Sequence, residues 1–335
     1  MMKKVFCFGE LLLRMSPEPG GEWLKNAVMP VYLGGAELNV AAALAKWDIP
    51  VKYCSAVPVN SLGTEIIDDL ASRNIDISAI HFSGKRFGIY FLQQGADLKK
   101  TDVIYDRAGS SFSELRKGMI NWKDVLKDCG WFHFSAISPA ISEDIAELCK
   151  EALEVATAMG LTISVDLNYR SKLWQYGKRP EEVMPGLVKY CHVVMGNIWA
   201  AEQLLAIPSL LESSAGKDTE TLVSAATDSI QKIQYSYPLV HSTAFTFRLE
   251  SQYFGVLGRD RSVISSRVFR QENIVDRVGS GDCFMAGLIY GISLGHAPLE
   301  IINFSAAAAI GKMKEKGDIT HQSALHIHNS IKEYL

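Results

Sequence analysis

The chain has 335 residues, 48% of them hydrophobic, and its 34 basic and 37 acidic side chains leave a net charge of −3. A chain of this length and composition can bury a large core. The balanced charge, without a long run of one sign, argues against nucleic acid or a membrane surface as the partner, so we expect a small-molecule ligand.

The N-terminus and the cysteines bear on where the protein works. Residues 1–9 superficially resemble a signal peptide, but Glu10 and Arg14 interrupt the apolar stretch before any cleavage site. No apolar run is long enough to span a bilayer, so we expect a cytoplasmic protein. The cysteines lack short paired spacings, which predicts buried thiols and neither a zinc site nor a disulfide framework. They are Cys7, Cys54, Cys129, Cys149, Cys191 and Cys283.

The first hundred residues contain segments that predict a small β element. Residues 11–33 lack a clear helical period, whereas Gly34-Gly35 precedes a small-residue stretch that reads as a helix. Residues 88–94 and 102–107 look like two strands joined by a turn around residues 95–97, with no room for a helix between them. Residues 11–33 and 84–108 are therefore predicted to form a β lid that covers a site.

The rest of the chain alternates short apolar runs with segments of helical period. Residues 142–159 begin with the N-cap residue Ser142 and end at Gly160, which is typical of a crossover helix. Residues 208–221 are the least patterned and predict a loop. This alternation indicates an α/β fold with a mainly parallel sheet and helices on both faces, built as one domain over residues 1–335. The strand-like runs are residues 51–57, 131–137, 161–168 and 192–196.

The strongest local signal is the glycine-rich turn Gly279-Ser280-Gly281-Asp282, which opens directly into a helix that runs to about Leu294. Glycines allow close approach of a ligand, and the free N–H groups of a helix start, aided by the helix dipole, form an anion site. The turn therefore predicts a phosphate site. It matches neither the P-loop pattern nor the first-strand position of a dinucleotide fingerprint.

Asp282 is open to two interpretations from this segment alone. It is either an N-cap residue, for which Asp is among the commonest choices, or a catalytic base. In phosphoryl transfer an Asp accepts the proton of the attacking hydroxyl while nearby amides stabilise charge on the transferred group.

Three segments in this order resemble the ribokinase-like (PfkB) carbohydrate kinase family, and most of all its 2-keto-3-deoxygluconate kinases. They are Gly9-Glu10 with residues 11–17, residues 34–41, and residues 276–287. The resemblance covers nearly the whole chain and implies a ribokinase-like fold. It also implies that Asp282 is the base and that Gly279, Ser280 and Gly281 form the anion hole.

The resemblance implies the substrate site as well. Two arginines at one pocket would suit a carboxylate, because the guanidinium offers planar bidentate recognition. Each arginine alone is equally compatible with a solvated or ion-paired surface residue, and each tyrosine with lid core. The implied substrate-binding residues are Gly34, Gly35, Asn39, Tyr90, Tyr105, Arg107, Asn168 and Arg170.

The nucleotide side is marked less clearly. The family places adenine between the signature helix and the next helix, here residues 303–313, although Ala306–Ala309 equally fits helix packing. Gly317-Asp318 resembles a family Gly-Asp pair whose role does not follow from the sequence. The implied cofactor-binding residues are Asn197, Arg248, Asn303, and again Gly279 and Gly281, with a surface residue as the alternative for Arg248.

Two positions depart from the family pattern. Ala200 stands where the family commonly has the Glu of Asn-x-x-Glu, and Glu202 lies two residues further on. We therefore assign no direct protein ligand to Mg²⁺ and expect phosphates and water to hold it. Arg277-Val278 replaces two threonines. The sequence leaves open whether a monovalent cation activates the protein.

The resemblance thus implies ATP-dependent phosphorylation of the terminal hydroxyl of a sugar acid, with 2-keto-3-deoxygluconate converted to its 6-phosphate. A fructokinase-like kinase of a neutral ketose is the nearer alternative. A non-catalytic sugar-acid sensor, suggested by Ala200, is the distant one. Family analogy and the open strand edges of a lid predict a homodimer through the lid.

Overall fold

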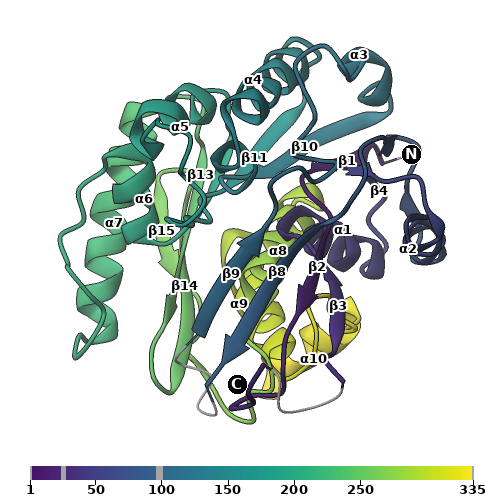
Figure 1. Cartoon of the computed structure of the whole chain (residues 1–335). Coiled ribbons are helices and arrows are strands. Elements are labelled where there is room, and N and C mark those ends of the chain that lie inside the picture. Colours follow the sequence, from purple (N-terminus) through teal and green to yellow (C-terminus); the bar gives the residue numbers. More distant parts are fainter. Residues whose placement is uncertain (1, 24–27, 96–100, 334–335) are drawn as a thin grey trace.

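The computed structural model describes residues 2–23, 28–95 and 101–333, which form a large sheet between two layers of helices and a separate small sheet (Figure 1). The strand β1 (Lys4–Phe8) lies inside the large sheet, and its apolar residues are almost fully buried. The stretch that resembles a signal peptide is therefore a core strand. No helix in the described part of the chain is long and apolar enough to cross a membrane.

The large sheet has ten strands and is parallel from β6 to β13. The strands β14 to β16 add an antiparallel edge beyond β13. This arrangement confirms the predicted α/β class with a mainly parallel sheet. In spatial order the strands are β15 (Ser262–Ser265), β14 (Gln252–Arg259), β13 (Ser242–Arg248), β12 (Val193–Gly196), β11 (Thr162–Asp166), β10 (Cys129–Ser135), β1, β4 (Val51–Cys54) and β6 (Ile75–Asp76), with β16 (Phe269–Arg270) on β14.

Helices cover both faces of this sheet because successive strand residues point to opposite sides. Phe6 and Phe8 pack into one core, and Val5 and Cys7 into the other. The first face carries α3 (Trp122–Val125), η1 (Ser138–Ala140), α4 (Glu143–Ala158), α5 (Pro180–Val188), α6 (Ile198–Leu205) and α7 (Thr219–Ser236). The second carries α1 (Ala36–Lys46), α2 (Ser61–Ser72), α8 (Ser280–Ser293), α9 (Pro298–Met313) and α10 (Ala324–Glu333).

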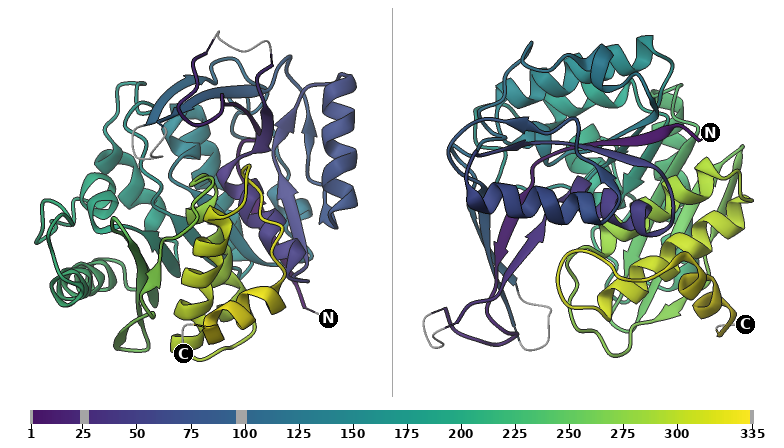
Figure 2. Two further views of the ribbon diagram at one scale, coloured as in Figure 1. Left: turned by 90° about the horizontal axis from the view of Figure 1, so that it is seen from below. Right: turned by 90° about the vertical axis from the view of Figure 1, so that its right-hand side faces the viewer.

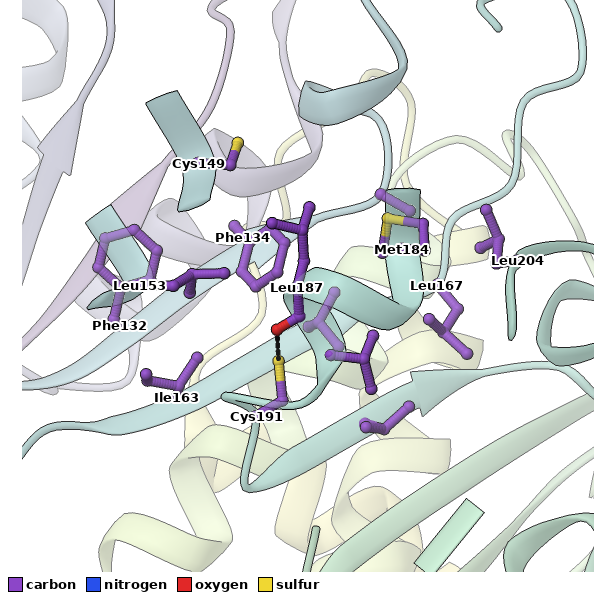
Figure 3. Close-up of a cluster of buried hydrophobic side chains, with 14 of the residues drawn as sticks. Phe132, Phe134, Cys149, Leu153, Ile163, Leu167, Met184, Leu187, Cys191 and Leu204 are labelled. Carbon is purple, nitrogen blue, oxygen red and sulfur yellow. Dashed lines mark hydrogen bonds between the residues drawn. The ribbon is translucent and has the colours of Figure 1, made fainter. Parts of the chain in front are cut away.

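The helix expected over residues 142–159 is α4, and the hydroxyl of Ser142 caps it by accepting a hydrogen bond from the Ile145 N–H at 3.2 Å. All six cysteines are buried free thiols, as predicted. Figure 3 shows Cys149 and Cys191 among the apolar side chains of the first core, where the Cys191 thiol donates to the carbonyl of Leu187.

The small sheet confirms the predicted β lid. It has the order β3 (Val31–Gly34), β2 (Leu12–Met15), β8 (Gly88–Gln94) and β9 (Thr101–Asp106), and it stands apart from the helices (Figure 2). The strands β8 and β9 are antiparallel, as a hairpin requires, but most of the predicted turn at residues 95–97 lies outside the described residues. A further short pair joins β5 (Ala56–Val57) to β7 (His81–Phe82), so the run predicted at residues 51–57 is divided between β4 and β5.

Candidate active site

A cavity of about 1240 Å³ lies between the lid and the ends of the parallel strands. Its wall combines the lid strands β8 and β9 with the carboxyl ends of β11, β12 and β13 and the first turn of α8. Open α/β folds bind ligands outside the carboxyl ends of their strands, so this cavity is where a ligand site is expected. The predicted turn and the predicted lid residues are thus brought to one place.

The glycine turn starts α8 at the cavity wall. Gly279 is the N-cap residue and has φ 80°, a left-handed conformation that favours glycine. A Cβ at this position would also lie 2.1 Å from the backbone carbonyl oxygen of Asp318. Gly279, Ser280 and Gly281 all line the cavity. The Ser280 N–H donates to the carbonyl of Arg277 at 3.4 Å, and the first N–H groups of a helix, which lack partners within the helix, are suited to an anion.

Asp282 lies in the first turn of α8, three residues after the N-cap, so capping does not account for it. Its carboxylate is buried on the cavity wall and accepts a hydrogen bond from the Asn39 amide at 2.7 Å. Burial raises the pKa of Asp282 to about 7, and the nearby Glu37 carboxylate adds to this against the opposing hydrogen bond. A carboxylate whose pKa lies near neutrality is well suited to general base catalysis.

A buried ion network lies beside the turn. Arg14 donates to Asp318 at 2.6 Å and to Asp276 at 2.7 Å, and its side chain is only 1% exposed. The Tyr90 hydroxyl donates to the same Asp318 carboxylate at 2.8 Å. At Gly34 a Cβ would lie 2.3 Å from Asp318 Oδ2, so the absence of a side chain there makes room for the network. The Gly-Asp pair, whose role the sequence left open, thus supports the glycine turn and the lid.

Arg107 lines the cavity just after the end of β9, and its positive charge is paired with the carboxylate of Glu10. Its Nε donates to Glu10 at 2.6 Å, and the Ser110 hydroxyl donates to the other oxygen of that carboxylate. Both charged side chains are at least 95% buried, and Arg107 still lines the cavity. The predicted acid-binding arginine is therefore held in place by a carboxylate that the sequence interpretation did not assign.

The remaining predicted substrate residues lie around the same cavity. Tyr105 pairs across the lid with Tyr90, and their ring centroids are 6.4 Å apart. Asn168 and Arg170 follow the end of β11, and Arg170 is exposed, with Nη1 donating to the carbonyl of Tyr169. The cavity wall includes Gly35, Asn39, Tyr90, Tyr105, Arg107, Asn168 and Arg170, whereas Gly34 is not among its lining residues.

Two of the predicted nucleotide-binding residues outside the glycine turn line the cavity, and the third does not. Arg248 lines the cavity and donates to the Ser280 hydroxyl at 2.8 Å, which places its guanidinium at the glycine turn. Asn197 also lines the cavity, and its Oδ1 caps α6 by accepting from the Ala200 N–H at 2.8 Å. Asn303 is not a lining residue, and its side-chain oxygen accepts from the Arg267 N–H at 2.9 Å. Its predicted contact with nucleotide stays a prediction.

Two buried carboxylates at or beside the site were given no role from the sequence, because their surroundings come from distant parts of the chain. Glu37, inside the motif at residues 34–41, accepts hydrogen bonds from the Ser135 N–H and hydroxyl at 2.8 and 2.6 Å. Asp166, at the end of β11, is 5% exposed on the cavity wall. Burial, followed by the charge of Asp282, raises the pKa of Asp166.

The chain is similar to known carbohydrate kinases over most of its length. Residues 2–324 match the profile of the pfkB family carbohydrate kinases. The chain is 29% identical to 2-dehydro-3-deoxygalactonokinase of Haloferax volcanii (95% of this chain, 93% of the relative). It is 26% identical to 2-dehydro-3-deoxygluconokinase of Bacillus subtilis (93% and 90%). The crystal structure of 2-dehydro-3-deoxygluconokinase from Thermotoga maritima superposes with a TM-score of 0.89 at 31% identity, over 98% of this chain and 99% of the other. The protein is therefore a member of the pfkB family of carbohydrate kinases.

Proposed function

We propose that this kinase transfers the γ-phosphate of ATP to the terminal hydroxyl of a 2-keto-3-deoxy sugar acid, giving the 6-phosphate of 2-keto-3-deoxygluconate or of its galacto epimer. The observation that carries the proposal is the placement of Asp282 in one cavity with Arg107 and Arg170. Arginine binds carboxylates in a bidentate manner, and a neutral sugar has no such group. Two relatives named as kinases of 2-dehydro-3-deoxy acids support it.

In the proposed reaction Asp282 accepts the proton of the terminal hydroxyl, while the Asn39 amide orients the carboxylate. The hydroxyl oxygen forms a bond to the γ-phosphorus as the bond to the β–γ bridging oxygen breaks, and ADP leaves with that electron pair. The N–H groups of the turn at residues 279–281 stabilise the charge that develops on the transferred group. The lid strands β8 and β9 cover the acid and exclude water from it.

Magnesium fits this cavity through phosphate and water. Among the residues that the structure describes, no group of three or more His, Cys, Asp or Glu side chains could hold a metal ion. Ala200 lines the cavity where the family carries Glu, and Glu202 is not a lining residue. The Asp166 carboxylate and the Asn197 amide would face the hydrated ion, because hard cations prefer oxygen ligands. When bound, the ion neutralises phosphate charge.

One observation favours the alternative of a neutral ketose. Glu10 forms an ion pair with Arg107, so the two side chains together carry no net charge that would attract a carboxylate. Arg170 is then the main positive group available to one. A fructokinase-like kinase would retain Asp282 and the glycine turn and need neither arginine for a carboxylate.

The test is ATP consumption by the purified protein with Mg²⁺ and a panel of 2-keto-3-deoxygluconate, its galacto epimer, gluconate, fructose, ribose and adenosine. Turnover confined to the keto-deoxy acids is expected. Turnover with fructose alone would contradict the carboxylate role of the arginines and leave the kinase assignment intact. If none of the compounds is phosphorylated, the non-catalytic sensor replaces the enzyme.

The partner proposal is a homodimer through the lid. The edge strands β3 and β9 carry Val31 and Ile104, which are 55% and 51% exposed. Open strand edges with exposed apolar side chains favour pairing with a second copy. Sedimentation of the native chain should give twice its mass, and Ile104→Lys should shift it to the monomer.

A further inference from the structure

Lys312, in the last turn of α9, carries a charge that the proposed reaction does not use. Its side chain is completely buried, and Nζ donates to the backbone carbonyl of Glu315 at 3.3 Å. It forms no ion pair with any carboxylate of the described residues, because Arg14 already holds Asp276 and Asp318. A buried ammonium without a paired carboxylate costs several kcal/mol, so a residue of this kind calls for an explanation.

The explanation is suggested by what Lys312 contacts. A Cβ built on Gly279 would lie 3.2 Å from Lys312 Cε, so the lysine stem packs directly against the glycine turn. The N–H groups of Val275 and Asp276 donate to the carbonyl of Met313, which ties the start of the turn to the same end of α9. Lys312 does not line the cavity, so it contacts the turn without reaching a ligand.

The surroundings are electrostatically suited to a cation. Burial lowers the pKa of Lys312, whereas the carboxylates of Asp276, Glu315 and Asp318 act in the opposite direction. The last turn of a helix also presents carbonyl groups that interact favourably with positive charge. The amine of Lys312 thus lies at the C-terminal end of α9, next to the N-terminal end of α8 that faces the cavity.

We propose that the Lys312 ammonium is a built-in monovalent cation that holds the glycine turn in its anion-binding form and adds positive charge behind the γ-phosphate. Lys312 is a positioning residue, because it acts through Gly279 and touches no substrate. The inference rests on the proposed kinase function. It further implies that the protein needs no added K⁺ or NH₄⁺.

The main test compares Lys312→Ala with Lys312→Met. Both variants remove the charge, but alanine leaves space for a small cation whereas methionine fills it. With choline as the only monovalent cation, both should lose about 10- to 100-fold in kcat, by analogy with the loss caused by removing a group that orients a metal ligand. Their KM for the sugar acid should stay unchanged. At equal ionic strength, K⁺ or NH₄⁺ should restore Lys312→Ala and not Lys312→Met.

Two controls separate this role from a merely structural one. Lys314→Met changes an exposed lysine two residues away and should keep wild-type activity in every salt. Circular dichroism and thermal melting show whether each variant is folded. Loss of activity that no monovalent cation restores in a folded Lys312→Ala protein would overturn the proposal, as would full activity of that variant in choline.

The wild-type protein supplies a test that needs no variant. Its turnover should be the same in choline, K⁺ and NH₄⁺, and a many-fold activation by either small cation would show that Lys312 does not fill this role. If no sugar acid is turned over at all, the kinase proposal fails independently. The Lys312 proposal is then tested by binding, since a non-hydrolysable ATP analogue with Mg²⁺ should raise the melting temperature of the wild type more than that of Lys312→Ala in choline.

Discussion

The two sides of the glycine turn differ in how their charges are compensated. Behind it, Arg14 bridges Asp276 and Asp318, and all three side chains are nearly inaccessible to water. On the cavity side, Arg170 is exposed, and the Nε of Arg277 is buried without a hydrogen-bond partner among the described residues. The first set has partners within the protein and holds the fold, whereas the second has capacity left for a ligand. Substitutions should therefore reduce stability on one side and binding or turnover on the other.

The largest effect is expected for Asp282→Asn, which removes the proposed base. Turnover should fall by about 10²- to 10⁴-fold, the usual contribution of a positioned base. Folding should not suffer. Because the pKa of Asp282 is raised in the folded protein, ionisation of its carboxylate lowers the free energy of unfolding as pH rises from about 4 to about 7. Asparagine does not ionise, so the variant does not have this loss. Kinetics together with thermal melting at pH 8 check both statements. Near-normal turnover would refute the base assignment.

Arg14→Met should act on stability. It leaves Asp276 and Asp318 as buried carboxylates without their cation, and breaking a buried pair in this way costs about 3–5 kcal/mol. Denaturant unfolding measures the loss. As a control, Arg73→Met breaks a half-exposed ion pair on α2 and should cost about 1 kcal/mol or less. Equal losses in the two variants would mean that the buried network contributes no more than a surface pair.

Arg170→Met should act on binding alone. Removing the proposed charge-assisted hydrogen bonds to the carboxylate of a sugar acid should raise KM by about 10- to 100-fold, corresponding to about 1.5–3 kcal/mol. The free energy of unfolding should stay within experimental error, because the side chain is exposed. Steady-state kinetics with a keto-deoxy acid provide the measurement. An unchanged KM for the acid would count against this arginine as a carboxylate ligand.

The pH dependence should be the smallest effect near neutrality. Asp282 must be ionised to accept a proton, so kcat/KM should rise with pH, bend near pH 7 and level off above it. Below the bend the rate should fall by about tenfold per pH unit. A kcat/KM that stays constant down to pH 5 would contradict Asp282 as the base whose ionisation sets the rate near pH 7. Kinetics in buffers of constant ionic strength give the profile.

The agreement between sequence and structure is best where the signal is local. The Ser142 cap, the two hairpin strands and the turn before Asp282 each depend on residues close together in the chain, and the structure has all of them. The division of residues 51–57 into two short strands was not foreseen, because apolar composition does not reveal which strands will pair.

The site was only partly predictable. Arg107 was assigned from the family resemblance, but its partner Glu10 lies 97 positions away along the chain, and such a pair exists only once the lid folds against β1. The structure gives the Asn303 side chain a backbone partner that the sequence did not indicate, and its assigned contact with nucleotide stays a prediction. Sequence patterns indicate which residue types are present, whereas their hydrogen-bond partners depend on long-range packing.

The sequence by itself determined the α/β class, the lid, the glycine turn and the carboxylate beside it, because periodicity and turn chemistry act over a few residues. Only the tertiary structure decided the chemical state of those groups. The pKa of Asp282 depends on burial and on Glu37, and the ammonium of Lys312 meets the turn only because α9 packs on α8. Desolvation and charge interactions act through space, so they are fixed when segments far apart in the chain come together.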